Sequence, residues 1–190
     1  MFAHSNLLRF AVAALACAGL SAQAPARSPW DAGASLVLPL DGLKKVTQAS
    51  GLGGLVLEGG YNGYVHGTKL PFRASVSLNA FPGKEVDYVK SSLLGLQVAA
   101  DVFAPTGIDR LSMVTGLSLN RWRWDYQDAT HRVTSTMKGP KMGARFGFDY
   151  EVNPRLTASL LLQVTELGVD AQSIRGYNPT WIQAGAKYRF

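Results

Sequence analysis

The chain has 190 residues, of which 47% are hydrophobic and 17% are charged, and its formal net charge is +6. This length predicts one domain, and the hydrophobic content excludes an intrinsically disordered chain. The longest basic run is Lys44-Lys45. A nucleic-acid-binding domain concentrates its cations on one face, so no nucleic-acid partner is predicted.

Residues 1–26 have the layout of a secretory signal peptide. A short, weakly basic start precedes the apolar run Phe10–Leu20, which is too short to cross a bilayer as a helix. Small residues permit cleavage after Ala24 or after Ala26, and both alternatives stay open. Cleavage would remove Cys17, the only cysteine, so no disulfide is predicted in the mature chain. Lipid attachment at Cys17 is a weaker alternative, because the residues before it fit the lipoprotein pattern poorly.

Polar and apolar residues then alternate with a period of two, which predicts β-strands. In the last such segment Ala186 and Tyr188 share the apolar face, whereas Lys187 and Arg189 share the polar face. We interpret residues 27–190 as a single domain with eight such segments. They lie near residues 31–40, 52–65, 72–80, 93–102, 111–126, 141–150, 156–165 and 182–190.

The fifth segment contains a phase slip. Its apolar residues Leu117 and Leu119 are odd-numbered, whereas Trp122 and Trp124 are even-numbered. A β-bulge near Asn120 would return all four side chains to one face. Alternatively, the strand leaves the bilayer at this point and no longer needs to alternate.

The connections alternate in length along the chain. Four are long, near 41–51, 82–90, 127–140 and 168–179, and three are short, near 66–70, 104–110 and 152–155. An even number of strands with long loops at one end and short turns at the other is typical of outer-membrane barrels. Both termini should then lie at the short-turn end. The first long connection is expected to hold a short helical turn at 41–46.

The two strand faces differ in a way that assigns the inside of the barrel. The apolar face consists of Leu, Val, Ala, Phe and Met, and soluble monomers rarely expose a patch of that size. We therefore predict an all-β, eight-stranded, antiparallel, up-and-down transmembrane β-barrel with a polar lumen and a lipid-facing apolar exterior. The charged residues expected in the lumen are Glu58, Arg73, Asp101, Arg145, Asp149, Lys187 and Arg189.

Aromatic residues gather near the strand ends, where two girdles would anchor a barrel at the membrane interfaces. At the long-loop end these residues are Trp122, Trp124, Tyr126 and Trp181. At the short-turn end they are Phe72, Tyr150, Tyr188 and Phe190.

Over about residues 30–190 the chain resembles the small eight-stranded outer-membrane β-barrel superfamily, which includes the transmembrane domain of outer membrane protein A. The most specific element is the C-terminal strand that ends in Tyr188-Arg189-Phe190. The resemblance implies that Tyr188 and Phe190 form a signal for the barrel assembly machinery. It also implies the outer membrane of a diderm bacterium, contact with its lipids, and periplasmic termini.

Catalytic and metal-binding motifs are scarce. The mature chain has two histidines, His66 and His131, without the spacing of a metal site, so neither a metal nor a cofactor is predicted. Asp128, His131 and Ser135 share one long loop and could in principle activate a hydroxyl nucleophile. Their spacing matches no lipid A-modifying barrel enzyme, and we do not predict an enzyme.

The favoured function is a structural or surface-interaction role for a barrel whose lumen is filled by side chains. The alternatives are a narrow channel for small solutes, a lipid A-modifying acyl hydrolase or transferase, and a soluble periplasmic ligand-binding barrel if the polar face were outside. Lipopolysaccharide phosphates are a further expected partner; the sequence does not predict the oligomeric state. The basic residues of the long loops that could meet these phosphates are Lys44, Lys45, Lys84, Lys90, Arg132, Lys138 and Arg175.

Overall fold

The computed structural model describes residues 28–48, 51–136, 139–166 and 178–190. The predicted signal peptide, its cleavage sites, Lys138 and Arg175 lie outside these ranges. The described elements are β1 (Trp30–Leu40), α2 (Asp41–Thr47), β2 (Gly54–Tyr64), β3 (Pro71–Phe81), β4 (Glu85–Val86), β5 (Val89–Pro105), β6 (Leu111–Gln127), β7 (Arg132–Thr136), β8 (Lys141–Asn153), β9 (Leu156–Thr165) and β10 (Thr180–Arg189).

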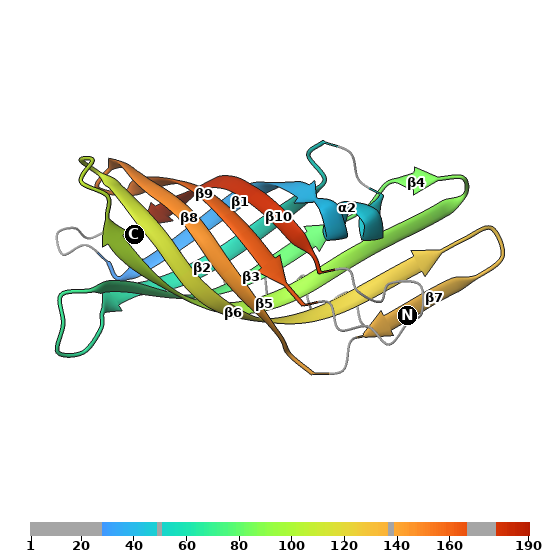
Figure 1. The fold of residues 1–190 in the computed structure, drawn as a ribbon, viewed down its shortest axis with the longest axis horizontal. Helices are drawn as coiled ribbons and strands as arrows, with labels where there is room; N and C mark the ends of the chain where they lie inside the picture. Colours follow the sequence, from blue (N-terminus) through green and yellow to red (C-terminus); the bar gives the residue numbers. More distant parts are fainter. Residues whose placement is uncertain (1–27, 49–50, 137–138, 167–177) are drawn as a thin grey trace.

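Eight of the strands form a closed antiparallel barrel (Figure 1). Each strand pairs with the next in the order β1, β2, β3, β5, β6, β8, β9 and β10, and β10 pairs back with β1. The short strands β4 and β7 extend two of the connections. Within the described residues, β4 pairs with β5 and β7 pairs with β6. The predicted eight-stranded up-and-down architecture is therefore confirmed.

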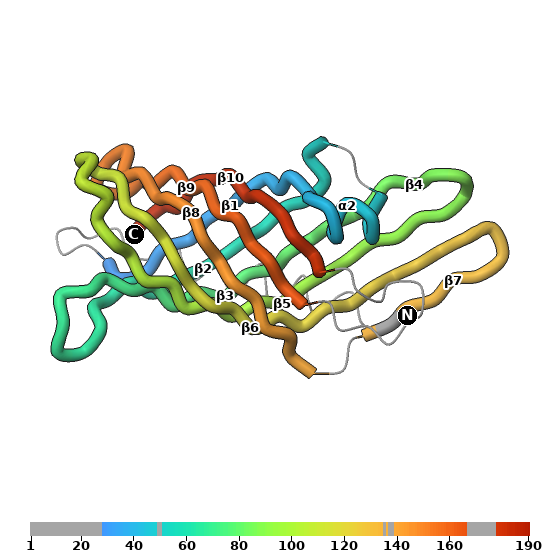
Figure 2. The backbone as a smooth tube through the Cα atoms, in the orientation of Figure 1, coloured from blue at the N-terminus to red at the C-terminus, as the bar shows by residue number. Residues whose placement is uncertain are grey.

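The two ends of the barrel differ. The turns after β2, β5 and β8 lie at the end where the C-terminus is marked, whereas α2, β4 and β7 lie at the opposite, long-loop end (Figure 2). The backbone N–H of Ser28 donates to the carbonyl of Phe190 at 3.0 Å, which places both ends of the described chain at the short-turn end. The helical turn expected in the first long connection is present as α2.

α2 has only seven residues. Among the described residues, no helix combines the length and the apolar composition that a bilayer crossing requires.

The outer face of the barrel is apolar across its middle. Exposed side chains there belong to Leu36, Val76, Leu96, Val98, Leu117, Leu119, Phe146, Phe148 and Leu160. Their inward-facing neighbours along the same strands are mostly polar or small. The soluble-barrel alternative required the polar face to be outside, and this condition is not met.

β6 crosses the phase slip without a bulge. Its register with β5 is continuous from Gln127 to Ser112, opposite Lys90 to Pro105, so the bulge predicted near Asn120 is absent. Its side chains keep alternating beyond that point, so alternation does not cease where the alternative allowed it to. The inner face instead changes from polar to aromatic along one regular strand.

Candidate functional site

The lumen is stacked in layers that recur in the same order on several strands. From the short-turn end, the inward positions of β3 carry Arg73, Asn79 and then Phe81. Those of β10 carry Lys187, Gln183 and then Trp181. The layers are therefore an ionic one, an amide one and an aromatic one, and α2 lies beyond the last (Figure 1).

The ionic layer is a chain of alternating acids and bases. Arg73 donates to Asp31, with its Nε 2.9 Å from Oδ2, and its Nη1 lies 3.2 Å from Oε2 of Glu58. Arg145 bridges onward, with Nη2 3.5 Å from the same Glu58 oxygen and Nη1 3.4 Å from Oδ2 of Asp101. All five side chains are buried. Charges removed from water need such partners to remain ionised.

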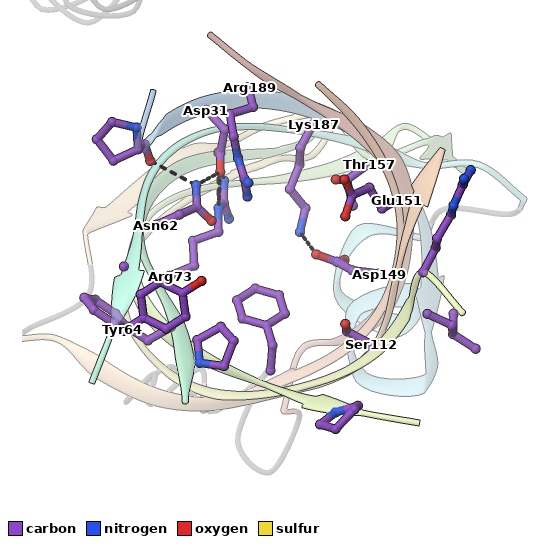
Figure 3. Close-up of a pocket in the computed structure, with 18 of the residues that line it drawn as sticks. Asp31, Asn62, Tyr64, Arg73, Ser112, Asp149, Glu151, Thr157, Lys187 and Arg189 are labelled. Carbon is purple, nitrogen blue, oxygen red and sulfur yellow. Dashed lines mark hydrogen bonds and ion pairs between the residues drawn. The ribbon is translucent and has the colours of Figure 1, made fainter. Parts of the chain in front are cut away.

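A second pair lies beside this chain. Lys187 Nζ is 2.6 Å from Oδ2 of Asp149, whose Oδ1 accepts a hydrogen bond from the Ser159 hydroxyl at 2.7 Å. Figure 3 shows Lys187 reaching across the lumen toward Asp149. Arg189 is half-buried at the same end. The structure thus places six of the seven charged residues expected in the lumen in the buried interior and Arg189 at its mouth.

Small inward residues make room for the long charged side chains. A Cβ built on Gly60 would lie 2.5 Å from Nε of Arg73. Because real Cβ atoms do not approach that closely, Gly60 is what allows the guanidinium to lie close against β2.

Asp31 was missed in the sequence analysis. It follows Trp30 at the start of β1, where the pattern is noisy, yet it shares its odd phase with the inward residue Ser35. That shared phase was the available signal, and Asp31 supplies the partner that Arg73 needs.

The amide layer separates the charges from the aromatic layer. Nδ2 of Asn79 donates to Oε1 of Gln97 at 2.9 Å, and Nδ2 of Asn120 donates to the Ser118 hydroxyl at 3.0 Å. Several of its polar atoms have no partner among the described residues, including Oδ1 of Asn120 and Oε1 of Gln163. Buried amides of this kind usually bind internal water.

Three aromatic rings form the centre of a cluster that we call the plug. Phe81 contacts Trp181 and Trp122 at centroid distances of 5.2 and 6.0 Å, and the two tryptophans are 6.0 Å apart. Helix α2 adds Leu43 and Val46, both buried. The complete plug consists of Val37, Leu43, Val46, Val56, Phe81, Leu93, Trp122, Trp124 and Trp181, with Tyr126 packed against it.

The predicted long-loop girdle is therefore wrong for its tryptophans. Trp122 and Trp181 have no exposed surface and Trp124 is 7% exposed, whereas girdle residues face outward. Tyr126 is only partly buried, but it packs on Trp124 at 5.5 Å. The physical reason is that each strand keeps its pleat. On β6, Trp122 and Trp124 share the inner face with Asn120, and on β10, Trp181 shares the inner face with Gln183. The lumen is accordingly polar in one half and apolar in the other.

The lumen opens at the short-turn end into a cavity of about 790 Å³, which we call the vestibule. Its charged wall includes Asp31, Arg73, Lys187 and Arg189, which lie around the opening in Figure 3. Phe103 and other apolar residues complete the wall. The vestibule ends at the ionic layer, where paired side chains meet across the barrel.

Aromatic residues at the short-turn end lie mostly at the outer surface. Tyr150 and Tyr188 are 45% and 44% exposed, and Tyr188 contacts the half-buried Phe190 at a centroid distance of 5.7 Å. Phe72 is half-buried and lines the vestibule.

A further pair at this end was not anticipated. Trp30 and Tyr61 are both exposed and contact each other edge to face at 5.1 Å. Outward aromatics therefore mark this rim of the barrel.

Of the three loop residues considered for catalysis, Asp128 and His131 lie close together, with Nδ1 of His131 3.6 Å from Oδ1 of Asp128, and the side chain of Ser135 is outside the described part of the structure. Oδ1 of Asp128 accepts hydrogen bonds from the backbone N–H groups of Thr130 and His131, at 2.8 and 2.6 Å. These bonds hold the pKa of Asp128 below its usual value. The carboxylate thus caps the turn before β7. Ser135 lies four residues beyond His131 in an extended strand, which separates their Cα atoms by roughly 13 Å.

A closed antiparallel barrel with an apolar outer belt and charged residues inside defines a small eight-stranded barrel of the outer-membrane type. Neisserial surface protein A shares this fold, with a TM-score of 0.64 at 15% identity over 87% of this chain and 100% of that one. Ail of Yersinia pestis has a TM-score of 0.54 at 11% sequence identity, and the match covers 85% of this chain and 96% of Ail. The N-terminal domain of Pseudomonas aeruginosa OprF has a TM-score of 0.54 at 10% sequence identity, and the match covers 87% of this chain and 100% of that domain. At these identities the likeness concerns the fold.

We found no match of the chain to a protein-family model or, in sequence, to a curated protein. Ail has also been solved with the heparin analogue sucrose octasulfate, with a TM-score of 0.50 to this chain.

Proposed function

We propose that this protein is an integral outer-membrane barrel with a closed lumen that serves a structural or surface-interaction role. The observation that carries the proposal is the pairing of an apolar outer belt with a lumen closed by the plug. An apolar belt of this kind requires lipid around it. Buried Trp122 and Trp181 close the long-loop end, which favours a closed barrel over the channel alternative.

Conductance in planar bilayers tests the closed lumen. The refolded wild-type barrel should give no steady conductance. A variant with Trp122→Ala and Trp181→Ala should conduct more, whereas Trp30→Ala, which changes an exposed tryptophan at the other end, should behave like the wild type. Steady wild-type conductance would instead support the narrow channel.

Membrane orientation can be tested with single cysteines, because the chain after Cys17 has none. Thr130→Cys lies at the long-loop end and Ile108→Cys lies in the exposed turn at the opposite end. A membrane-impermeant maleimide should label Thr130→Cys in intact cells and Ile108→Cys only after the outer membrane is disrupted. The reverse pattern would contradict periplasmic termini, and labelling of both in intact cells would argue against this location.

The long-loop rim supports contact with lipopolysaccharide phosphates. Lys90, Arg121 and Arg132 are exposed and Arg123 is half-buried. In the strand register Arg121 lies opposite Leu96, a residue of the apolar outer belt. Gln127 lies opposite Lys90 on one neighbouring strand and opposite Arg132 on the other. Cations directly beyond an apolar belt are placed to meet anionic headgroups.

Ail, which shares the fold, binds a sulfated sugar, and this agrees with recognition of a polyanion by such a barrel. Co-purified lipopolysaccharide should fall in a variant with Arg121→Gln and Arg132→Gln. It should be unchanged in Arg110→Gln, whose arginine lies at the short-turn end. Equal amounts in all three proteins would contradict this partner.

Finally, we propose that Tyr188 and Phe190 are recognised by the barrel assembly machinery. Phe190→Asp should lower the fraction of heat-modifiable, membrane-inserted barrel more than Arg189→Asp does, because the aromatic outer face of β10 is altered. The refolding yield of the purified variants in detergent provides the control. Equal insertion of both variants in cells would contradict a signal at Phe190.

A further inference from the structure

The ionic chain in the lumen has one acid more than it has bases. It runs Asp31, Arg73, Glu58, Arg145, Asp101, so an acid stands at each end. The neighbouring pair of lysine and aspartate on β10 and β8 is neutral in itself. Among the described buried residues, the lumen therefore carries four acids and three bases. If all were ionised, one negative charge would have no buried base to match it, since the fourth base, Arg189, lies half-buried at the mouth of the lumen.

The three acids of the chain are not held equally. Asp31 accepts hydrogen bonds from both Nε and Nη2 of Arg73 and from Nδ2 of Asn62 at 2.6 Å, and it lines the vestibule, where water reaches it. Glu58 lies between two guanidinium groups, both of which contact its Oε2, although its Oε1 is buried without a hydrogen-bond partner among the described residues. Both acids are thus well stabilised as carboxylates.

Asp101, at the other end of the ionic chain, has the weakest contacts of the three acids. Its one ion-pair contact is 3.4 Å long, from Oδ2 to Nη1 of Arg145. Its Oδ1 is buried without a hydrogen-bond partner among the described residues and rests above Gly116, where an added Cβ would lie 2.1 Å away. The residue is 1% exposed and does not line the vestibule. A buried carboxylate with one oxygen lacking a donor and the other in a single long ion pair is poorly compensated when charged.

The charged groups that face Asp101 do not alter this conclusion. They are Arg145 on β8, Arg73 on β3, Lys187 on β10 and Glu58 on β2. Arg73 is committed to two other acids, and Lys187 is bound to Asp149 at 2.6 Å. Arg145 is shared with Glu58, which is itself an acid and opposes a second negative charge nearby.

We propose that Asp101 is a proton-binding site inside the folded barrel and carries a neutral carboxylic acid at neutral pH. The proton comes from a hydronium ion of the solvent during or after folding: one O–H bond of hydronium breaks and releases water, and one O–H bond forms on the carboxyl group of Asp101. The charges then balance, with three acids and three bases ionised in the lumen. The bound proton completes the buried polar half of the barrel, which holds no fourth base among its described buried residues.

Infrared spectroscopy of the refolded barrel at neutral pH tests this directly. The wild type should show the C=O stretch of a protonated carboxylic acid, and the band should shift when aspartate alone is labelled with ¹³C. Asp101→Asn should lose the band. Asp149→Asn, which removes an acid paired with a lysine, should keep it. Absence of the band in the wild type, or its survival in Asp101→Asn, would overturn the proposal.

Unfolding in urea gives a second readout, which does not depend on the function proposed above. Because Asp101→Asn replaces a neutral acid by a neutral amide of the same shape, its urea midpoint should match or exceed that of the wild type. Glu58→Gln should lower the midpoint, since it removes a true charge from between two arginines. If Asp101→Asn lowers the midpoint as much as Glu58→Gln does, Asp101 is ionised and the proposal fails. A wild-type midpoint that falls when sodium is replaced by a bulky organic cation, without an acid band, would assign a metal ion instead.

Discussion

The two halves of β6 are built in opposite ways. In the half nearer the short turns, Leu117 and Leu119 point outward and Ser118 points inward. In the half nearer the long loops, Arg121 is exposed outside and Trp122 is fully buried inside. The backbone register does not change between them. One strand therefore has a membrane-protein pattern at one end and a soluble-protein pattern at the other.

The difference shows that the surrounding medium decides which face is apolar. Where lipid surrounds the barrel, the outside must be apolar and the inside can hold charges. Where water surrounds it, an apolar interior such as the plug stabilises the fold by the hydrophobic effect. The inversion between Leu119 and Arg121 thus marks the boundary of the apolar belt more sharply than any single aromatic residue does.

The largest effect on the free energy of unfolding is expected from removing an arginine of the ionic chain in the polar half of the lumen. Arg73→Met should destabilise the barrel by about 3–5 kcal/mol, because Asp31 and Glu58 would lose their shared cation in a buried site. Urea unfolding followed by heat-modifiable gel mobility measures this loss.

The matched control is Arg123→Met. Arg123 forms a partly exposed pair with Asp125 at 3.3 Å, and such a pair contributes under about 1 kcal/mol. Equal losses in the two variants would mean that the ionic chain is not a buried network.

The plug should be nearly as sensitive as the ionic chain. Trp122→Ala is expected to cost about 3 kcal/mol, because it leaves a cavity between Phe81 and Trp181. The same urea assay applies. Trp30→Ala removes an exposed tryptophan and should cost clearly less, so a larger loss there would locate the structural aromatics at the outer rim instead.

A smaller effect is expected from overfilling the plug. A Cβ on Gly95 would lie 2.3 Å from the Trp122 ring, so Gly95→Ala should cost about 1–3 kcal/mol through displacement of that ring. Gly59→Ala is the control, since the nearest atom to its added Cβ is 3.9 Å away. A neutral Gly95→Ala would show that the plug is loosely packed.

The smallest effect is expected from substitutions of Arg121, which lies just outside the boundary of the apolar belt. Arg121→Ser should change the free energy of unfolding by less than about 0.5 kcal/mol, because the side chain is exposed and has no buried role. Urea midpoints in detergent measure this. Arg121→Leu should be equally mild there, and a large loss in either variant would place Arg121 within the packed structure.

Much of this arrangement could be predicted from which residues in each strand are odd-numbered and which are even-numbered, because these two sets face opposite sides. The eight strands, their closure and the inward direction of Arg145 and Lys187 follow from a period of two. The same parity also places Trp181 with Gln183 and Trp122 with Asn120. The girdle prediction failed because it followed the chemistry of tryptophan rather than its phase along the strand.

Other features depend on contacts between distant segments, which local patterns do not encode. Leu43 and Val46 are too few to predict a buried helix, because the other members of the plug lie on strands distant in the sequence. The role of Asp128 as a turn cap likewise depends on the backbone geometry of the residues that follow it. Asp31 had a readable phase, but its partner Arg73 lies 42 residues away.

The seam between β1 and β10 joins the two ends of the described barrel, from Asp31 opposite Arg189 to Leu40 opposite Thr180. β10 is the last of the described strands to be synthesised, so the free edge of β1 stays unpaired until the end of the chain is available. A chain cut short before β10 would keep two open edges, which lipid cannot satisfy. Closure of the barrel therefore requires the first and the last strand together, since only the full set of strands leaves no open edge.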